Sequence, residues 1–201
     1  MYNAILLLGP TGSGKTPLGS YIEKKGIWNK RCFHFDFGKE LRTISEANVI
    51  PSQFIKGDVD YIEKVLKEGA LLENETFYIA EKILNSFIKR NSISSDDVIL
   101  LNGLPRHTGQ AEDVDSIITI KLVIYLDCPL EVIKERVQLN IGGDRSDRTD
   151  DSIEEIKEKL EIFNERTIPL LQYYEKKNTP IKKVSISVNT KPDEILRYLN
   201  R

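Results

Sequence analysis

Residues 9–16 have the types and spacing needed to bind phosphate. They read GPTGSGKT, which fits the pattern GxxxxGK[ST], and they follow directly on the apolar run Ala4–Leu8. Glycine allows loop conformations in which successive backbone N–H groups face phosphate oxygens, and a following helix adds the positive end of its dipole. We therefore predict a phosphate-binding loop made of Gly9, Thr11, Gly12, Ser13, Gly14, Lys15 and Thr16.

Two side chains at the end of this loop would act on a nucleotide. Lys15 adds a positive charge over the β- and γ-phosphates, and Thr16 places a hydroxyl where Mg²⁺ can be held. The alternative is a glycine-rich turn that only joins a strand to a helix. The apolar run before the loop, and Pro17 at a place that suits the first turn of a helix, favour the phosphate-binding interpretation.

An alternation of strands and helices positions the loop. Stretches with helical spacing separate five short aliphatic or β-branched runs, which are Ala4–Leu8, Cys32–Phe37, Val98–Asn102, Leu122–Asp127 and Val184–Val188. This order predicts an α/β three-layer fold, in which helices cover both faces of a five-stranded parallel sheet.

Local signals predict where several helices start. Ser152 and Glu155 have capping-box spacing, so a helix is expected over about 152–177, bent near Pro169. The region 43–73 has a helical pattern and no strand pattern, which indicates a helical excursion from the sheet edge. Further helix starts are expected at Asp58, at Pro129, and at Thr190 with Asp193.

Composition limits the class of protein. The chain has 201 residues, 40% hydrophobic and 30% charged, which is typical of a packed globular domain. A formal net charge of −2 argues against general binding to nucleic acid or an anionic membrane, and no signal peptide or spanning segment is recognised. We expect a cytoplasmic monomer, with Cys32 and Cys128 as reduced core thiols and no zinc.

The stretch that follows the third run carries a family resemblance. Val98–Asn102 leads into Gly103-Leu104-Pro105-Arg106, with Gln110 four residues later. This resembles the DGFPR…Q signature of the nucleoside monophosphate kinases, adenylate kinase especially. Four further segments resemble that family's TGDxLR, GxLV, DR and RxDD motifs in the same order, and they are Phe37–Arg42, Gly69–Leu72, Glu135-Arg136 and Arg148–Asp151.

The resemblance implies a single P-loop kinase domain over residues 1–201, with a helical acceptor-binding insertion at about 37–73 and a short zinc-free lid at about 139–151. The implied reaction is transfer of the γ-phosphoryl group of ATP, with Mg²⁺, to a nucleoside monophosphate. Gln110 occupies the position where adenylate kinases read the acceptor base, which favours AMP.

The resemblance also implies roles for individual side chains. Arg42 and Arg106 would grip the acceptor monophosphate, while Arg136 and Arg148 would surround the donor phosphates and the transferring group. The catalytic set is then Lys15, Arg106, Arg136 and Arg148. The acceptor-side set is Gly38, Arg42, Leu72, Gly103, Arg106, Gln110, Arg148 and Lys159.

The chemistry of phosphoryl transfer is consistent with these residue types. Arginine stays protonated and binds phosphate oxygens through a planar fork, so several arginines can neutralise two nucleotides that meet end to end. A phosphate oxygen is already an ionised nucleophile, so no general base is required. The protein has to align the groups, neutralise charge and exclude water.

The chain departs from the family pattern near the metal. Asn102 replaces an aspartate that in the family helps hold Mg²⁺ through water, and the Thr16 hydroxyl is a candidate replacement ligand. Thr16 and Asn102, the latter through water, are therefore our predicted metal residues. Asp36, at the end of a strand, is a further candidate to approach the metal.

Other departures lie near the acceptor and the lid. Lys39 and Phe37 replace small or acidic residues of TGDxLR, and the Phe37 ring would either stack on a base or fill the space of one. Lys159 replaces an arginine, and Arg145 is an extra lid arginine. Two alternatives therefore stay open: a kinase for a pyrimidine nucleotide or another small acceptor, and a nucleotide-binding regulatory module with little turnover.

Overall fold

The computed structural model describes residues 1–144 and 152–200. The strands form one parallel sheet in the order β2-β3-β1-β4-β5. They are β1 (Tyr2–Leu8), β2 (Cys32–Asp36), β3 (Val98–Asn102), β4 (Ile118–Asp127) and β5 (Ile181–Ser185). The predicted five-stranded parallel sheet is confirmed.

Strand ends differ from the prediction where side chains or pairing decide them. β2 stops at Asp36, and Phe37 begins a helix, because the Asp36 carboxylate accepts the Lys39 backbone N–H at 3.0 Å. The last strand is β5 and not Val184–Val188, because its register with β4 begins at Ile181 and ends at Ser185. β1 and β4 begin earlier than predicted, at Tyr2 and Ile118.

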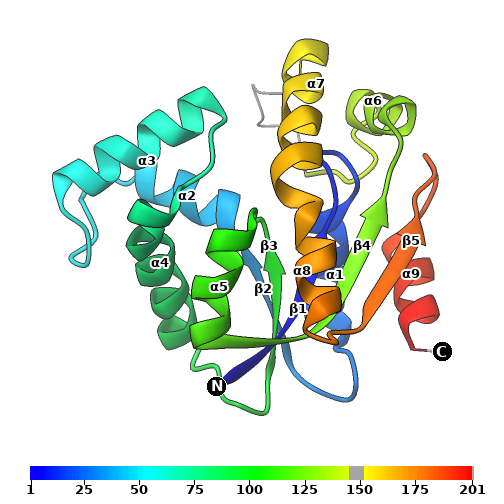
Figure 1. Ribbon diagram of the computed structural model, residues 1–201, viewed down its shortest axis with the longest axis horizontal. Coiled ribbons are helices and arrows are strands. Elements are labelled where there is room, and N and C mark those ends of the chain that lie inside the picture. The colour runs from blue at the N-terminus through cyan, green and yellow to red at the C-terminus, as the bar shows by residue number, and fades with distance from the viewer. Residues whose placement is uncertain (145–151, 201) are drawn as a thin grey trace.

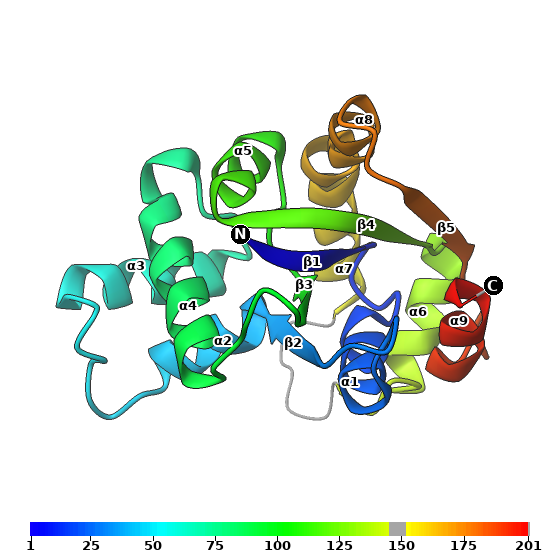
Figure 2. The same ribbon diagram turned by 90° about the horizontal axis from the view of Figure 1, so that it is seen from below.

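Helices cover both faces of the sheet (Figure 1), with α1, α6 and α9 on one side and α5 and α8 on the other (Figure 2). Their bounds are α1 (Lys15–Lys25), α2 (Phe37–Ser45), α3 (Lys56–Glu68), α4 (Phe77–Arg90), α5 (Thr108–Ile117), α6 (Leu130–Gln138), α7 (Ile153–Ile162), α8 (Pro169–Lys176) and α9 (Pro192–Leu199). A 3₁₀ turn, η1 (Asn74–Thr76), precedes α4.

Two predicted helix caps are wrong. Asp58 lies inside α3, where its carboxylate accepts the Ile55 N–H at 3.2 Å, so the helix starts at Lys56. Thr190 does not cap α9, because its hydroxyl accepts the Ser187 N–H at 2.9 Å and so stabilises the preceding loop.

Helix α9 is capped by residues next to the predicted ones, and the helix start predicted at Pro129 is close to correct. In α9 the Glu194 carboxylate accepts the Lys191 N–H at 3.0 Å. Pro129 lies one residue before α6, as its N-cap.

Near Pro169, where the sequence predicts a bend, the structure shows a change of helix type. Ser152 and Glu155 form the capping box that starts α7. Before the proline, the chain passes through a π-helical turn, η2 (Phe163–Thr167), after which Pro169 opens α8. Proline has no backbone N–H to donate to the preceding turn of an α-helix. The π-helical turn between α7 and α8 accommodates this missing hydrogen bond.

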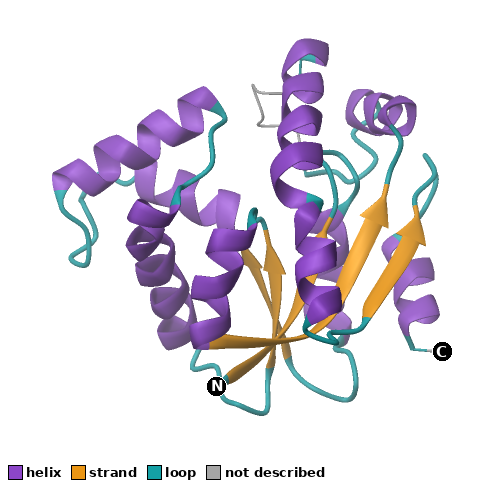
Figure 3. Cartoon of the chain, viewed as in Figure 1, coloured by secondary structure: helices purple, strands orange, loops and turns teal. Residues whose placement is uncertain are grey.

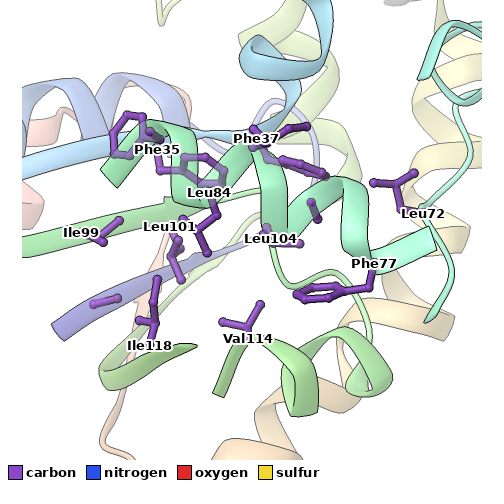
Figure 4. Close-up of a cluster of buried hydrophobic side chains, with 14 of the residues drawn as sticks. Phe35, Phe37, Leu72, Phe77, Leu84, Ile99, Leu101, Leu104, Val114 and Ile118 are labelled. Carbon is purple, nitrogen blue, oxygen red and sulfur yellow. The ribbon is translucent and has the colours of Figure 1, made fainter. Parts of the chain in front are cut away.

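Apolar side chains form a core on each face of the sheet. One cluster joins the sheet to α4, α5 and α8, and includes Phe35, Leu84, Leu101 and Val114 (Figure 4). The other joins it to α1, α6 and α9 and contains Cys32 and Cys128, both buried and reduced. The two cysteines are core thiols, as predicted.

The arrangement places several irregular segments at one edge of the sheet. All strands point the same way (Figure 3), and α3 and α7 extend beyond their carboxyl ends (Figure 1). Residues 37–73, all of which are described, contain α2 and α3 and no strand. Residues 145–151 of the predicted lid, with Arg145 and Arg148, lie outside the described residues. Within the described chain, no helix is long and apolar enough to span a membrane.

Candidate active site

The phosphate-binding loop joins β1 to α1 at the carboxyl edge of the sheet. Gly14 is the N-cap of α1, so the amino end of this helix faces the loop. Gly12 and Gly14 have φ angles of 75° and 98°, which side chains disfavour. A Cβ on Gly12 would lie 2.9 Å from Val137 Cγ2, so the loop also lacks room for one. The backbone cradle therefore requires glycine at both positions.

Ser13 lies beneath this cradle. Its Oγ is buried and has no hydrogen-bond partner in the described part of the chain. A Cβ on Gly9 would approach that oxygen to 2.7 Å. Buried polar atoms normally have a partner, and Ser13 Oγ is one of two buried side-chain atoms of the described residues that lack one.

Two cations contact the loop. Lys15 Nζ donates to the carbonyls of Gly9 and Pro10 at 2.7 and 2.8 Å. Arg136, at the end of α6, donates from Nε to the Gly12 carbonyl at 3.3 Å. Nη2 of the same guanidinium faces Gly14, since a Cβ there would lie 3.0 Å from it.

The Arg136 guanidinium also contacts the loop that follows β5. Its Nη1 donates to the carbonyls of Ser187 and Val188 at 2.9 and 2.8 Å. Burial lowers the pKa of this guanidinium. Arg136 therefore links the phosphate-binding loop to the far edge of the sheet while it presents one nitrogen to the loop.

Three polar side chains meet where β2 and β3 end. Thr16 Oγ1 donates to Asp36 Oδ2 at 2.7 Å. Asn102 Nδ2 donates to the same carboxylate oxygen at 2.9 Å and to Thr16 Oγ1 at 3.0 Å. The meeting point contains a hydroxyl oxygen from Thr16 and a carboxylate from Asp36, which are ligand types that Mg²⁺ prefers, while Asn102 presents its N–H donors to both. These residues therefore fit a magnesium site beside the loop.

Arg106 is fixed through its backbone. Its N–H donates to Gln110 Oε1 at 2.8 Å, and its carbonyl accepts from Thr167 Oγ1 at 2.7 Å. The guanidinium makes no hydrogen bond or ion pair within the described residues, and burial lowers its pKa. A half-buried cation that makes no ion pair within the described residues is costly, so this side chain suits a negatively charged ligand.

Gln110 connects Arg106 to the acceptor-side segment. Its Nε2 donates to the Leu72 carbonyl at 2.8 Å, and His107 Nε2 lies 3.0 Å from the same oxygen. An amide has two N–H donors and two acceptor lone pairs. One donor and one acceptor position of Gln110 therefore remain for a ligand.

Phe37 fills space under the acceptor side. Its ring is buried and stacks on Phe35, with centroids 6.0 Å apart (Figure 4). The ring therefore belongs to the core and also lines the cavity, and its predicted relation to an acceptor base stays a prediction. The Lys39 side chain is exposed, and its backbone N–H donates to the Asp36 carboxylate that caps the start of α2.

One cavity of about 210 Å³ joins all these groups. Every predicted site residue that the structure describes lines it, except Ser13. They are Gly9, Thr11, Gly12, Gly14, Lys15, Thr16, Asp36, Gly38, Arg42, Leu72, Asn102, Gly103, Arg106, Gln110, Arg136 and Lys159. Arg148 lies outside the described residues.

Sequence reasoning missed some of the lining. Leu41, Val65, Phe163 and Thr167 also border the cavity. The first three have apolar side chains at helical spacing, which is a signal for core packing and does not distinguish a pocket wall. Thr167 shows no sequence signal, because its role depends on the carbonyl of Arg106 coming near it in the fold.

Comparison with known proteins agrees with this geometry. A family model described as adenylate kinase matches residues 7–179. The uridylate kinase of Saccharomyces cerevisiae is 30% identical over 90% of this chain and 81% of that protein. UMP-CMP kinase 2 of Caenorhabditis elegans is 30% identical over 88% and 84%, and an adenylate kinase of Prochlorococcus marinus is 26% identical over 87% and 85%. The chain thus belongs to the adenylate kinase family and is a nucleoside monophosphate kinase.

Proposed function

We propose that this enzyme transfers the γ-phosphoryl group of ATP to AMP, with Mg²⁺ on the donor phosphates. The observation that carries the proposal is that the phosphate-binding loop, Arg42 and Arg106 line one and the same cavity. With Lys15 and Arg136 beside the loop, this cavity offers cations to two polyanions that meet end to end.

At the donor end, the backbone of the loop and the start of α1 bind the phosphates. Lys15, held on loop carbonyls in the absence of ligand, turns its ammonium to the β- and γ-phosphates. Arg136 keeps the loop in place and offers Nη2 to the same oxygens. Thr16, and Asn102 through water, would hold the metal, which would neutralise charge on the donor phosphates.

At the acceptor end, Arg42 and Arg106 bind the monophosphate and point one of its oxygens at the donor. No residue has to remove a proton, because that oxygen is ionised. Lys159 of α7 adds charge from above the cavity. Arg148 lies outside the described residues, and its role at the transferring group stays a prediction.

Gln110 supports AMP as the acceptor. Its remaining N–H and lone pair match the acceptor and donor edge of adenine, the pairing that amide side chains make with this base. A second candidate, UMP or CMP as acceptor, is favoured by the similarity to uridylate and UMP-CMP kinases.

The experiment is to incubate the enzyme with ATP, Mg²⁺ and AMP, UMP, CMP or GMP in turn, and to measure kcat/KM for diphosphate formation. The highest value with AMP supports the proposal, and the highest with UMP or CMP supports the second candidate. Gln110→Asn should lower the preference for AMP without changing ATP affinity. Equal use of all bases by both proteins would contradict a role of Gln110 in base selection.

A further inference from the structure

The carboxylate beside the phosphate-binding loop comes from β2. Asp36 and Asn102 are register partners at the ends of the adjacent strands β2 and β3. Side chains at paired positions of parallel strands point to the same face, so these two lie next to each other. β3 supplies an amide at this place, and Asp36 supplies the negative charge.

The hydrogen bonds of Thr16 show what the Asp36 carboxylate does. A threonine hydroxyl has one hydrogen and two lone pairs. The hydrogen goes to Asp36 Oδ2 at 2.7 Å, and one lone pair accepts from Asn102 Nδ2 at 3.0 Å. The second lone pair is thereby fixed in direction and is left for a cation beside the loop.

The carboxylate itself is held from two sides. Asp36 Oδ2 accepts from Asn102 as well as from Thr16, while Oδ1 accepts the Lys39 N–H at the start of α2. The amino end of a helix favours negative charge. Asp36 therefore has a fixed orientation, and it connects the metal side of the cavity to α2, which carries Gly38 and Arg42.

We propose that Asp36 is the positioning residue of the metal site: it orients the Thr16 hydroxyl toward Mg²⁺ and supplies, from β2, the negative charge that Asn102 on β3 cannot. Asn102 orients Asp36 and Thr16 through its N–H groups. The inference rests on the Mg·ATP donor of the proposed function.

The test compares ATP affinity with Mg²⁺ and with EDTA by isothermal titration calorimetry, and Mn²⁺ affinity of the ATP complex by electron paramagnetic resonance. Asp36→Asn removes the charge but keeps a side chain that caps helices well. Partners that orient a metal ligand typically contribute about 10–100-fold in metal affinity, so the metal-dependent gain in ATP affinity should fall about tenfold or more. ATP affinity in EDTA should stay within about twofold of wild type, on the premise that the backbone loop binds the phosphates without the metal.

Two further variants separate this role from general damage. Asp127→Asn removes a carboxylate at the end of β4, paired with Lys183, and should leave the metal-dependent gain unchanged. The double variant Asp36→Asn with Asn102→Asp returns the charge to β3 and should recover most of that gain. A metal-dependent gain in Asp36→Asn equal to wild type, or a loss with no recovery in the double variant, would overturn the inference.

The measurements also separate this inference from the proposed function. If wild-type enzyme binds ATP equally with Mg²⁺ and with EDTA, the Mg·ATP donor itself is wrong. If wild type shows the gain and Asp36→Asn shows it equally, only the role of Asp36 is wrong.

Discussion

Arg106→Met should raise the stability of the ligand-free enzyme while it removes most of the activity. The guanidinium is half-buried, burial lowers its pKa, and it makes no ion pair within the described residues, so we expect its charge to destabilise the ligand-free protein. Its backbone contacts to Gln110 and Thr167 do not involve the side chain and remain in the variant. Methionine keeps the length and removes the charge.

The expected size follows from the two roles of the charge. Replacing buried ion pairs by apolar side chains is often stabilising by about 1–4 kcal/mol, and for one half-buried charge in a cavity that admits water we expect the low end. A gain of about 1 kcal/mol raises Tm by roughly 2–4 °C in a chain of this size. Removing the Arg106 charge from the acceptor phosphate should lower kcat/KM for the monophosphate by about 10³-fold.

The assay combines thermal unfolding of the ligand-free protein, a coupled assay of diphosphate formation and calorimetry of ATP binding. Arg197→Met, on the exposed face of α9, is the matched control and should change Tm and activity little. ATP affinity should stay at the wild-type value in Arg106→Met. A fall in Tm, or a loss of ATP affinity with acceptor affinity intact, would refute the assignment of Arg106 to the acceptor.

Three further changes test other parts of the structure. Gly12→Ala should lower the free energy of unfolding by about 1–2 kcal/mol in urea and weaken ATP binding, because the φ of Gly12 is 75° and an added Cβ would contact Val137. A variant that binds ATP as tightly as wild type would contradict the role of this glycine in the phosphate-binding loop. Asp97→Asn should destabilise by about 1–2 kcal/mol at neutral pH. Because the pKa of Asp97 in the folded protein is about 2, the difference in free energy of unfolding between wild type and Asp97→Asn should shrink as the pH falls from about 4 toward 2. A difference that does not change with pH, measured by urea unfolding, would refute this role of the carboxylate. Glu73→Gln should change the free energy of unfolding by less than about 1 kcal/mol, because the ion pair of Glu73 with Arg166 is exposed. A larger loss of stability would show that Glu73 stabilises the fold through interactions other than this pair.

Local patterns predicted the elements that local chemistry determines. The phosphate-binding loop depends on glycines within eight residues, and the capping box at Ser152 depends on neighbours, so both follow from the sequence. Strand β3 is buried throughout and appeared as an uninterrupted apolar run. The predicted carboxyl end of β3 agrees with the structure because Asn102 and Gly103 end the apolar run.

Features that depend on tertiary pairing were not predictable in the same way. The end of β5 follows from its register with β4, and Thr190 serves a loop that is defined only when Ser187 lies beside it. At the site, the sequence placed Thr16, Asp36 and Asn102 near a metal. Their hydrogen bonds depend on which strands are neighbours, and that order is not written in any local pattern.

Direct transfer between two nucleotides in one cavity is most directly tested by ³¹P nuclear magnetic resonance. The enzyme is incubated with Mg²⁺, AMP and ATP that carries ¹⁸O in the non-bridging positions of its γ-phosphoryl group. We predict that all the label appears in the β-phosphoryl group of the ADP formed from AMP, with little labelled inorganic phosphate. Release of the label mainly as inorganic phosphate, at a rate that does not depend on any nucleoside monophosphate, would contradict the account.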